Sequence, residues 1–209
     1  MAQSKISTDE RTDEELVEAY REGESGAMEI IIRRYERELL AFLTRLMGNR
    51  AAAEDVFQDT FIQIHQSASQ FDVSRRFKPW LFTIAANKGR DAFRRQGKHW
   101  NMVDLSAPVK RGASERGGAT FVDLLEGDPA ELGENLNAEE LRDRVRTVLD
   151  DLPYHFREIV LLAYFQRLSY NQIAESLDIP LGTVKSRLHA AIGAFGKAWK
   201  ATFDTPGTA

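Results

Sequence analysis

Basic and aromatic side chains alternate through residues 71–98, and their types suit binding to a polyanion. This stretch holds 8 basic and 2 acidic residues. Basic side chains hold a phosphodiester backbone, whereas aromatic rings stack on unpaired bases. From the pattern alone, a core role is favoured for most of these rings, Trp80 among them, with the charges in solvent. The residues concerned are Arg75, Arg76, Lys78, Lys88, Arg90, Arg94, Arg95 and Lys98, with Phe77, Trp80, Phe82 and Phe93.

A second candidate lies in residues 169–192, where a short helix, a break and a second helix form a helix-turn-helix pattern. Ser169 and Gln172 have the spacing of a capping box before the first helix. The second helix presents short polar and basic side chains, which suit base edges and phosphates. An ordinary helical hairpin with a solvated basic face is the alternative. The candidate contacts are Thr183, Lys185, Ser186, Arg187 and His189.

A third candidate is acidic and lies on the polar side of a helix predicted over residues 51–66. It consists of Glu54, Asp55, Gln58 and Asp59. Such a strip is either a solvated face or a docking site for a basic partner. The pattern alone does not separate these two interpretations.

Composition excludes several other functions. The 209 residues include no cysteine, so disulfides, thiolate chemistry and Cys-ligated metals are excluded. The net charge of −4 conceals a basic block with acidic flanks. No phosphate-binding glycine loop or nucleophile motif is present, and the four histidines are scattered. We therefore expect no catalytic residue, no metal and no cofactor. The polar, acidic N-terminus is not a signal peptide, which favours the cytoplasm.

The elements that must position these candidates are all predicted to be helices. Apolar residues recur at three and four positions, and no useful stretch alternates with period two. We expect an all-α protein of two small helical domains, residues 12–98 and 138–200, the second containing the helix-turn-helix. Residues 99–137 read as a flexible linker because glycine and polar residues dominate its middle. Its apolar island, Phe121-Val122-Asp123-Leu124-Leu125, is a candidate docking segment.

In their order, these segments resemble the extracytoplasmic-function sigma factors, the small two-domain sigma subunits of bacterial RNA polymerase. Residues 53–61, Ala-Glu-Asp-Val-Phe-Gln-Asp-Thr-Phe, are similar to that family's core-binding segment. Residues 180–188, Pro-Leu-Gly-Thr-Val-Lys-Ser-Arg-Leu, are similar to the start of its −35-reading helix. Residues 79–95 are similar to its −10-element segment through Pro79-Trp80-Leu81, Ile84-Ala85, Asn87, Asp91 and Arg94-Arg95.

The resemblance implies an alternative sigma factor, which is not an enzyme, and gives each candidate a role. The acidic strip would dock on a basic coiled coil of core RNA polymerase. The loop at about residues 69–78 would capture a flipped base of the −10 element. Lys78, Trp80, Asn87, Lys88, Arg90 and Arg94 would contact −10 DNA, and the second helix of the helix-turn-helix would read the −35 element. The partners implied are core polymerase, promoter DNA and an anti-sigma factor, with no small-molecule substrate.

The sequence departs from the family pattern in two places. Ala190-Ala191-Ile192-Gly193 follow the −35 motif where many members continue with arginines, and His65 stands where many have tryptophan. Three other functions remain: a sigma-like adaptor that sequesters an anti-sigma factor without binding DNA, an ordinary helix-turn-helix regulator, and an enzyme with a novel site. The basic charge at residues 75–98 and 185–187 favours the sigma factor, since an adaptor has no need of it.

Overall fold

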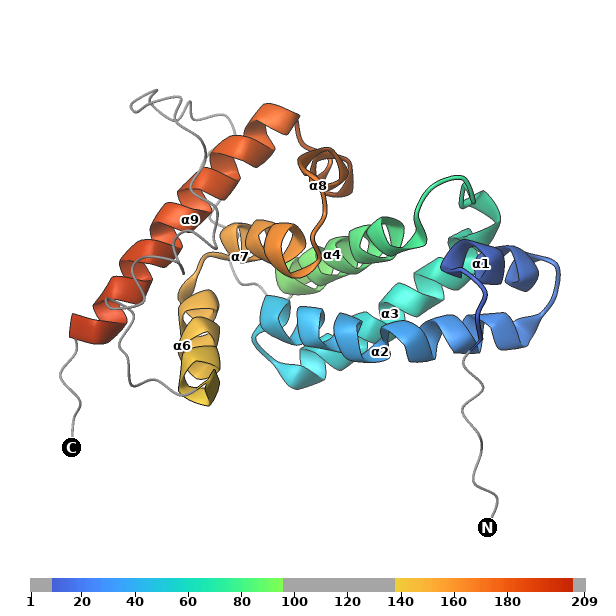
Figure 1. Cartoon of the computed structure of the whole chain (residues 1–209), viewed down its shortest axis with the longest axis horizontal. Coiled ribbons are helices and arrows are strands. Elements are labelled where there is room, and N and C mark those ends of the chain that lie inside the picture. The colour runs from blue at the N-terminus through green and yellow to red at the C-terminus, as the bar shows by residue number, and fades with distance from the viewer. Residues whose placement is uncertain (1–8, 96–137, 205–209) are drawn as a thin grey trace, which may run out of the picture.

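The computed structural model describes residues 9–95 and 138–204, and every regular element in these ranges is a helix (Figure 1). The predicted linker, residues 99–137, and its apolar island lie outside the described residues. The N-terminal module contains α1 Asp13–Arg21, α2 Ser25–Met47, α3 Arg50–Ser67, the 3-10 turn η1 Ala68–Gln70 and α4 Phe77–Arg95. The C-terminal module contains α6 Ala138–Asp151, α7 Tyr154–Val160, the π-helical turn η2 Leu161–Phe165, α8 Tyr170–Leu177 and α9 Leu181–Asp204.

Local signals in the sequence fix where several of these helices begin and end. The Thr12 side chain accepts a hydrogen bond from the Glu15 backbone N–H, and the Glu15 carboxylate accepts one from the Thr12 N–H, so a capping box begins α1. Gly48 ends α2 in the left-handed conformation with φ of 66°. The side chain of Asn49 then caps α3.

The core of the N-terminal module forms where α2, α3 and α4 pack together. Phe42 of α2 meets Phe82 of α4 edge to face, with ring centroids 5.2 Å apart. Phe77 and Phe82 are fully buried, so the core interpretation is confirmed for these two aromatic residues of the basic segment. Trp80 is only partly buried and lies against Phe71, with centroids 4.7 Å apart. The aromatic rings of this segment are therefore divided between the core and the rim of the module.

The helix-turn-helix is formed by α8 and α9. Ser169 and Gln172 make both bonds of the predicted capping box at the start of α8. Asp178 ends α8 with φ of 51°, a left-handed conformation that Asp tolerates better than most residues. Along α9, the side chains that face the rest of the module are Val184, Leu188, Ala191, Phe195 and Trp199, all of them buried. This stripe leaves the opposite side of α9 exposed.

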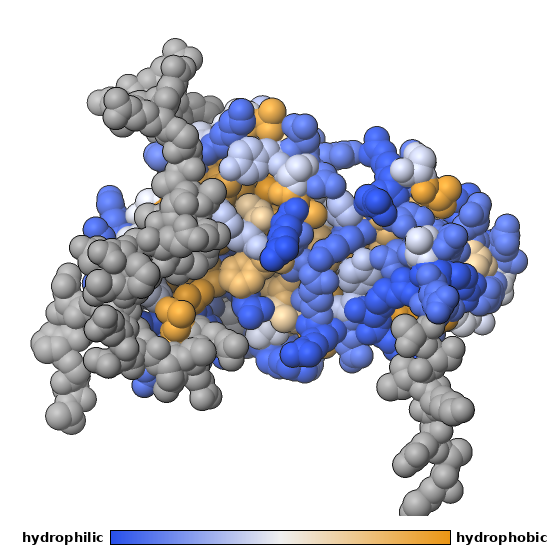
Figure 2. All heavy atoms as spheres, viewed as in Figure 1, coloured by the Kyte–Doolittle hydropathy of each residue, from blue (hydrophilic) through white to orange (hydrophobic). Residues whose placement is uncertain are grey.

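The two modules pack against each other in the described structure. The tightly packed side chains form one hydrophobic cluster with members from both modules. In Figure 1, α8 lies above α4 and packs against it, α7 meets the C-terminal end of α4, and α6 lies beside the C-terminal end of α2. In the space-filling view, hydrophobic atoms gather at the middle of the face, whereas the surface over α1 and α2 is largely hydrophilic (Figure 2). The helix α4 is therefore both a core helix of its own module and the surface that receives the other module.

Candidate nucleic-acid interface

The outer face of α4 brings together four of the six residues predicted to contact −10 DNA. Successive residues of an α-helix are rotated by roughly 100°, which places Trp80, Asn87, Arg90 and Arg94 within an arc of roughly 80°. The buried residues of α4 point the other way, into the module. Asn87 is exposed, and its side-chain oxygen accepts a hydrogen bond of 3.2 Å from Arg90. These four residues are called the α4 outer face below.

Lys78 and Lys88 are not on the α4 outer face. The ammonium of Lys78 is bound at 2.6 Å by Glu38 of α2 and lies 5.7 Å from the centre of the Phe82 ring. The ammonium of Lys88 donates to Gln63 of α3 at 2.9 Å. Each lysine therefore joins α4 to a neighbouring helix of its own module.

A hollow of about 590 Å³ lies where the loop before α4 would capture a flipped base. Phe71, Arg76 and Trp80 line it from the N-terminal module. Gln172 and Glu175 of α8 line it from the C-terminal module. A hollow with two aromatic rings and an arginine offers a base both a stacking surface and a cation for its phosphate. The helix-turn-helix module supplies part of its wall.

The predicted −35 contacts divide between two sides of α9. Lys185, Ser186 and His189 are exposed on the side opposite the buried stripe. Thr183 and Arg187 are half-buried on one flank. Burial lowers the pKa of Arg187; the nearby Glu158 carboxylate opposes this effect and Arg90 adds to it. Three of the five side chains thus face solvent directly, whereas Arg187 faces the contact between the modules.

The acidic strip on α3 is exposed apart from the half-buried Asp59, and it is partly paired within the molecule. Glu54 bonds Arg50 at 2.7 Å, and Asp59 lies 3.5 Å from Arg95 of α4. Asp55 and Gln58 are exposed on the same side of the helix. Exposed pairs of this kind are worth less than about 1 kcal/mol, so a basic partner displaces them at little cost.

His65, which departs from the family pattern, has a structural contact. Its Nδ1 atom is hydrogen bonded to the hydroxyl of Tyr20, and the two rings meet edge to face with centroids 6.0 Å apart. Tyr20 lies on α1 and His65 near the end of α3. The pair therefore fixes the first helix to the third.

Glu158 is a site residue that the sequence analysis missed. It is 0% exposed, and its Oε1 atom accepts a hydrogen bond of 3.0 Å from Arg90, whose side chain is 16% exposed. Among the described residues, its Oε2 atom has no hydrogen-bond partner. Burial raises the pKa of Glu158, an effect that Arg90 and, less strongly, Arg187 and Arg94 oppose. The signal in the sequence that could have found Glu158 is its spacing of four residues from Tyr154, which places both side chains on one face of a short helix.

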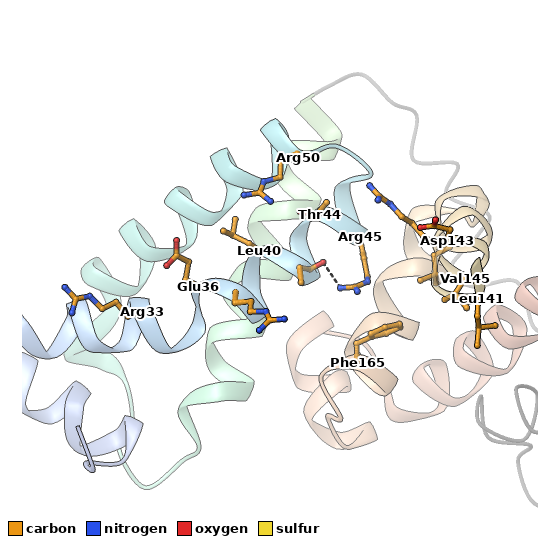
Figure 3. Close-up of a pocket in the computed structure, with 14 residues that line it drawn as sticks. Arg33, Glu36, Leu40, Thr44, Arg45, Arg50, Leu141, Asp143, Val145 and Phe165 are labelled. Carbon is orange, nitrogen blue, oxygen red and sulfur yellow. Dashed lines mark hydrogen bonds between the residues drawn. The ribbon is translucent and has the colours of Figure 1, made fainter. Parts of the chain in front are cut away.

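A groove of about 900 Å³ runs between α2 and the helices α6 and η2 (Figure 3). Leu40 of α2, Leu141 of α6 and Phe165 of η2 give it apolar walls. The guanidinium of Arg45 donates to the Ala41 carbonyl at 3.1 Å and lies 5.2 Å from the centre of the Phe165 ring. Its charged lining residues are five arginines and two carboxylates: Arg33, Arg37, Arg45, Arg50, Arg146, Glu36 and Asp143.

Two other kinds of site were sought in the part of the chain that the structure describes. Residues 9–95 and 138–204 contain no group of three or more His, Asp or Glu side chains placed to hold a metal ion. Among the helices of the same ranges, none is long and apolar enough to span a membrane.

Together, a helix face that carries two arginines, a hollow lined by aromatic rings and a helix-turn-helix define a DNA-binding protein of transcription. Residues 31–99 match the family described as Sigma-70 region 2, and residues 142–194 match Sigma-70, region 4. The ECF RNA polymerase sigma-E factor of Escherichia coli K12 is 30% identical over 185 residues, 88% of this chain and 92% of that protein. The ECF RNA polymerase sigma factor SigW of Bacillus subtilis is 29% identical over 173 residues, 83% and 89% of the two chains. The chain belongs to the ECF sigma factors, which direct promoter-specific transcription initiation and are not enzymes.

Two solved structures share the fold. CnrH in complex with the cytosolic domain of CnrY superimposes with a TM-score of 0.60 at 22% identity, covering 92% of this chain and 99% of that one. The sigma factor RpoE in complex with the anti-sigma factor NepR, from Bartonella quintana, gives 0.57 at 22% identity, covering 82% and 96%. The likeness supports the arrangement of helices in both modules.

Proposed function

We propose that this chain directs core RNA polymerase to promoters by reading the −35 element with α9 and the −10 element with α4. The observation that carries this proposal is the α4 outer face, where an indole, an amide and two guanidinium groups lie on one side of a helix beside a hollow lined by aromatic rings. The protein acts where core polymerase works, in the cytoplasm. Run-off transcription with core polymerase and a pooled promoter library tests it. Transcripts that appear only with this protein, from templates sharing two short motifs, support the proposal.

In the −10 element, Asn87 is the residue we expect to contact a base directly. It is exposed at the middle of the α4 outer face, and an amide offers a donor and an acceptor to a base edge. Trp80 borders the hollow, while Arg90 and Arg94 suit phosphates. Lys78 and Lys88 support α4 through α2 and α3. Asn87→Ala should reduce permanganate reactivity of the −10 thymines while core binding is kept; equal loss of both contradicts the assignment.

We expect Lys185, Ser186 and His189 to enter the major groove of the −35 element. Thr183 and Arg187 lie at the flank of this contact surface. The double change Lys185→Ala with Arg187→Ala should weaken −35-dependent transcription, since each good contact is worth about 1–3 kcal/mol. Core binding should stay intact. Lys200→Ala is a matched control, because Lys200 is exposed near the far end of the same helix. An equal effect from Lys200→Ala would indicate general charge attraction in place of groove reading.

Core docking is assigned to the acidic strip on α3. Reversing charge with Asp55→Arg and Asp59→Arg should weaken binding to core polymerase, because like charges then face the basic coiled coil. Glu29→Arg is the control, since Glu29 is exposed on a different helix, α2. The readout is the dissociation constant for purified core. Unchanged affinity in the double variant contradicts this docking surface.

The groove between α2 and α6 is the surface we assign to an anti-sigma factor. Its apolar walls and excess of arginines fit an amphipathic helix whose polar side is acidic. Because both modules line it, a helix bound there holds the modules together. A synthetic helix with leucines on one side and glutamates on the other tests the chemistry by fluorescence anisotropy. A lysine version is the matched control. Equal binding of the two peptides, or no effect of Arg37→Glu on the glutamate version, contradicts the assignment.

A sigma-like adaptor remains the second candidate. It would use the same groove and would leave the basic residues of α4 and α9 idle. In the run-off experiment it gives no transcripts from any template, although the chain is folded and the core is active. That result would replace the sigma factor by the adaptor.

A further inference from the structure

We propose that Glu14 of α1 is a positioning residue for capture of the −10 base, and that Arg21 of the same helix assists it. Neither side chain touches DNA in this proposal. They hold the two ends of the loop of residues 71–76, which connects η1 to α4 and borders the hollow described above. The inference rests on the proposed function, because it concerns how the site for a flipped base keeps its shape.

The first turn of α4 takes its cap from a distant part of the chain. A helix begins with backbone N–H groups that have no acceptor inside the helix, and a side-chain oxygen just before the helix usually supplies one. Arg75 and Arg76 precede α4, and arginine side chains carry only donors. The Phe77 N–H donates instead to the Glu14 carboxylate at 2.8 Å, although 63 residues separate the two positions. Phe77 is 0% exposed, so solvent cannot supply the acceptor when the carboxylate is removed.

The start of the loop is held by the same helix. The guanidinium of Arg21 donates to the Phe71 carbonyl at 3.4 Å. Between its ends the loop folds on itself. The Asp72 carboxylate accepts from the Ser74 N–H at 3.0 Å and from the Ser74 hydroxyl at 2.7 Å, and the Asp72 carbonyl accepts from the Arg75 N–H at 2.9 Å. A loop closed in this way keeps its own turn, and its anchored ends decide where that turn lies.

The aromatic rings of the hollow stand at the two ends of this loop. Phe71 and Phe77 meet edge to face with ring centroids 5.9 Å apart. The Trp80 ring centroid lies 4.7 Å from that of Phe71 and 5.8 Å from that of Phe77. Phe71 and Trp80 line the hollow directly. A shift of either end of the loop therefore changes the stacking surface that is offered to a base.

Helix α1 is itself fixed to its module, so its contacts transmit the position of the module to the loop. In Figure 1, α1 lies close to the loop that leads into α4. Asp13, the residue before Glu14, accepts hydrogen bonds from Arg34 at 2.5 Å and from the Tyr35 hydroxyl, both of α2. The histidine–tyrosine pair described above fixes α1 to α3. Glu14 is thus the point at which a firmly held helix meets the start of α4.

Loss of the Glu14 carboxylate should weaken base contacts and spare phosphate contacts. The Phe77 N–H would be left buried without an acceptor, a cost that favours fraying of the first turn of α4. Trp80 lies at the end of that turn, whereas Arg90 and Arg94 lie about three turns further along the helix. The expected signature is a weaker preference for the captured base with unchanged binding to the DNA backbone.

The test measures binding of single-stranded −10 oligonucleotides to the holoenzyme formed from core polymerase and this chain. The −10 sequence comes from the run-off experiment described above. Each base of the motif is replaced in turn by an abasic site, and fluorescence anisotropy gives the dissociation constants. The abasic penalty at a position is the dissociation constant of the abasic strand divided by that of the intact strand.

The main variant is Glu14→Ala. Glu18→Ala is the matched control, since Glu18 is an exposed glutamate of the same helix. Glu14→Gln retains an oxygen acceptor at the same reach. Arg21→Ala tests the other end of the loop.

In the wild-type holoenzyme we expect one position with an abasic penalty of about tenfold, since stacking of one base is worth roughly 5- to 150-fold in affinity. Glu14→Ala should reduce this penalty to below about threefold, with binding of the abasic strand and of core unchanged within about twofold. Glu14→Gln should keep most of the penalty, and Glu18→Ala should keep all of it. Arg21→Ala should lower the penalty less than Glu14→Ala, because its bond is longer and its side chain is exposed.

A wild-type penalty in a folded Glu14→Ala chain overturns the inference and leaves the proposed function standing. An equal loss of affinity for the abasic and the intact strands also overturns the inference, because that result indicates a general structural role. If Glu14→Ala fails to fold by circular dichroism, an undiminished penalty in Arg21→Ala overturns it. A wild-type holoenzyme with no abasic penalty at any position overturns the proposed reading of the −10 element, and the inference with it.

Discussion

Ser176 gives a graded test of the packing of α8 against α4, called the closed arrangement here; in the open arrangement the two modules are apart and the α4 outer face is free of α8. The Ser176 side chain is 3% exposed and meets Thr83 across the contact between the two helices. Ser176→Gln places a longer amide there, and overpacking a tight contact costs about 1–3 kcal/mol. The open arrangement escapes this cost, since position 176 then leaves α4 and glutamine is a good helix former. At about 1.4 kcal/mol per tenfold, the closing equilibrium should fall by roughly 5- to 150-fold.

The matched variant is Ser176→Ala, which removes only the hydroxyl bond. Such a bond is worth about 1 kcal/mol, and the Thr83 hydroxyl also lies 2.7 Å from the Pro79 carbonyl, to which it donates. The assay is the apparent dissociation constant of the core-free chain for a fluorescent single-stranded −10 oligonucleotide. That constant varies inversely with the open fraction. Binding should therefore tighten from wild type to Ser176→Ala to Ser176→Gln, with helical content unchanged by circular dichroism. Unchanged or weaker binding by a folded Ser176→Gln chain would refute the reasoning.

Three further predictions concern pH and helix stability. Burial raises the pKa of Glu158 above its ordinary 4.5, so the closed arrangement is most stable below about pH 4.5 and loses stability as the pH rises through the raised pKa. Oligonucleotide binding should therefore weaken on acidification. Glu158→Gln should remove this component of the pH dependence. Gly193→Ala and Gly196→Ala should each raise the free energy of unfolding in urea by up to about 1 kcal/mol, because a Cβ at either position meets nothing within 4 Å. A fall in the unfolding free energy would mean that the added Cβ clashes with an atom that the structure places farther away, and it would contradict this prediction. Ser169→Ala should lower the unfolding free energy by about 1 kcal/mol through loss of the α8 capping box; an unchanged urea midpoint would rule out that contribution.

Local structure was predictable from the sequence because its causes are local. The capping box predicted at Ser169 is confirmed, and it depends on residues within one turn of each other. The capping box at Thr12 and the helix stop at Gly48 have equally local causes. The positions of Lys78 and Lys88 could also have been predicted from the sequence. Counting 100° steps from Asn87 along α4 sends both lysines away from the outer face.

The burial of Glu158 and the half-burial of Arg187 were not predictable in the same way. Both depend on how the C-terminal module meets α4, and residues 96–137 separate the two modules in the sequence. Arg187 looked like a groove-facing cation because its helix is basic; its neighbours Glu158 and Arg90 come from two other helices. Charge pattern predicts which residues are polar, and only tertiary contact decides which of them meet solvent.

The hydrogen bond between Thr83 and Ser176 has a consequence for how the sequence of this protein evolves. The two positions are 93 residues apart and belong to modules that are usually credited with separate halves of a promoter. If each module were under selection only for binding its own promoter element, substitutions at the two positions would accumulate independently. A shared contact instead makes a bulkier residue at one position tolerable only with a smaller one at the other. Correlated substitution at positions 83 and 176 across many descendants would indicate selection for the contact between the two modules as well as for DNA binding.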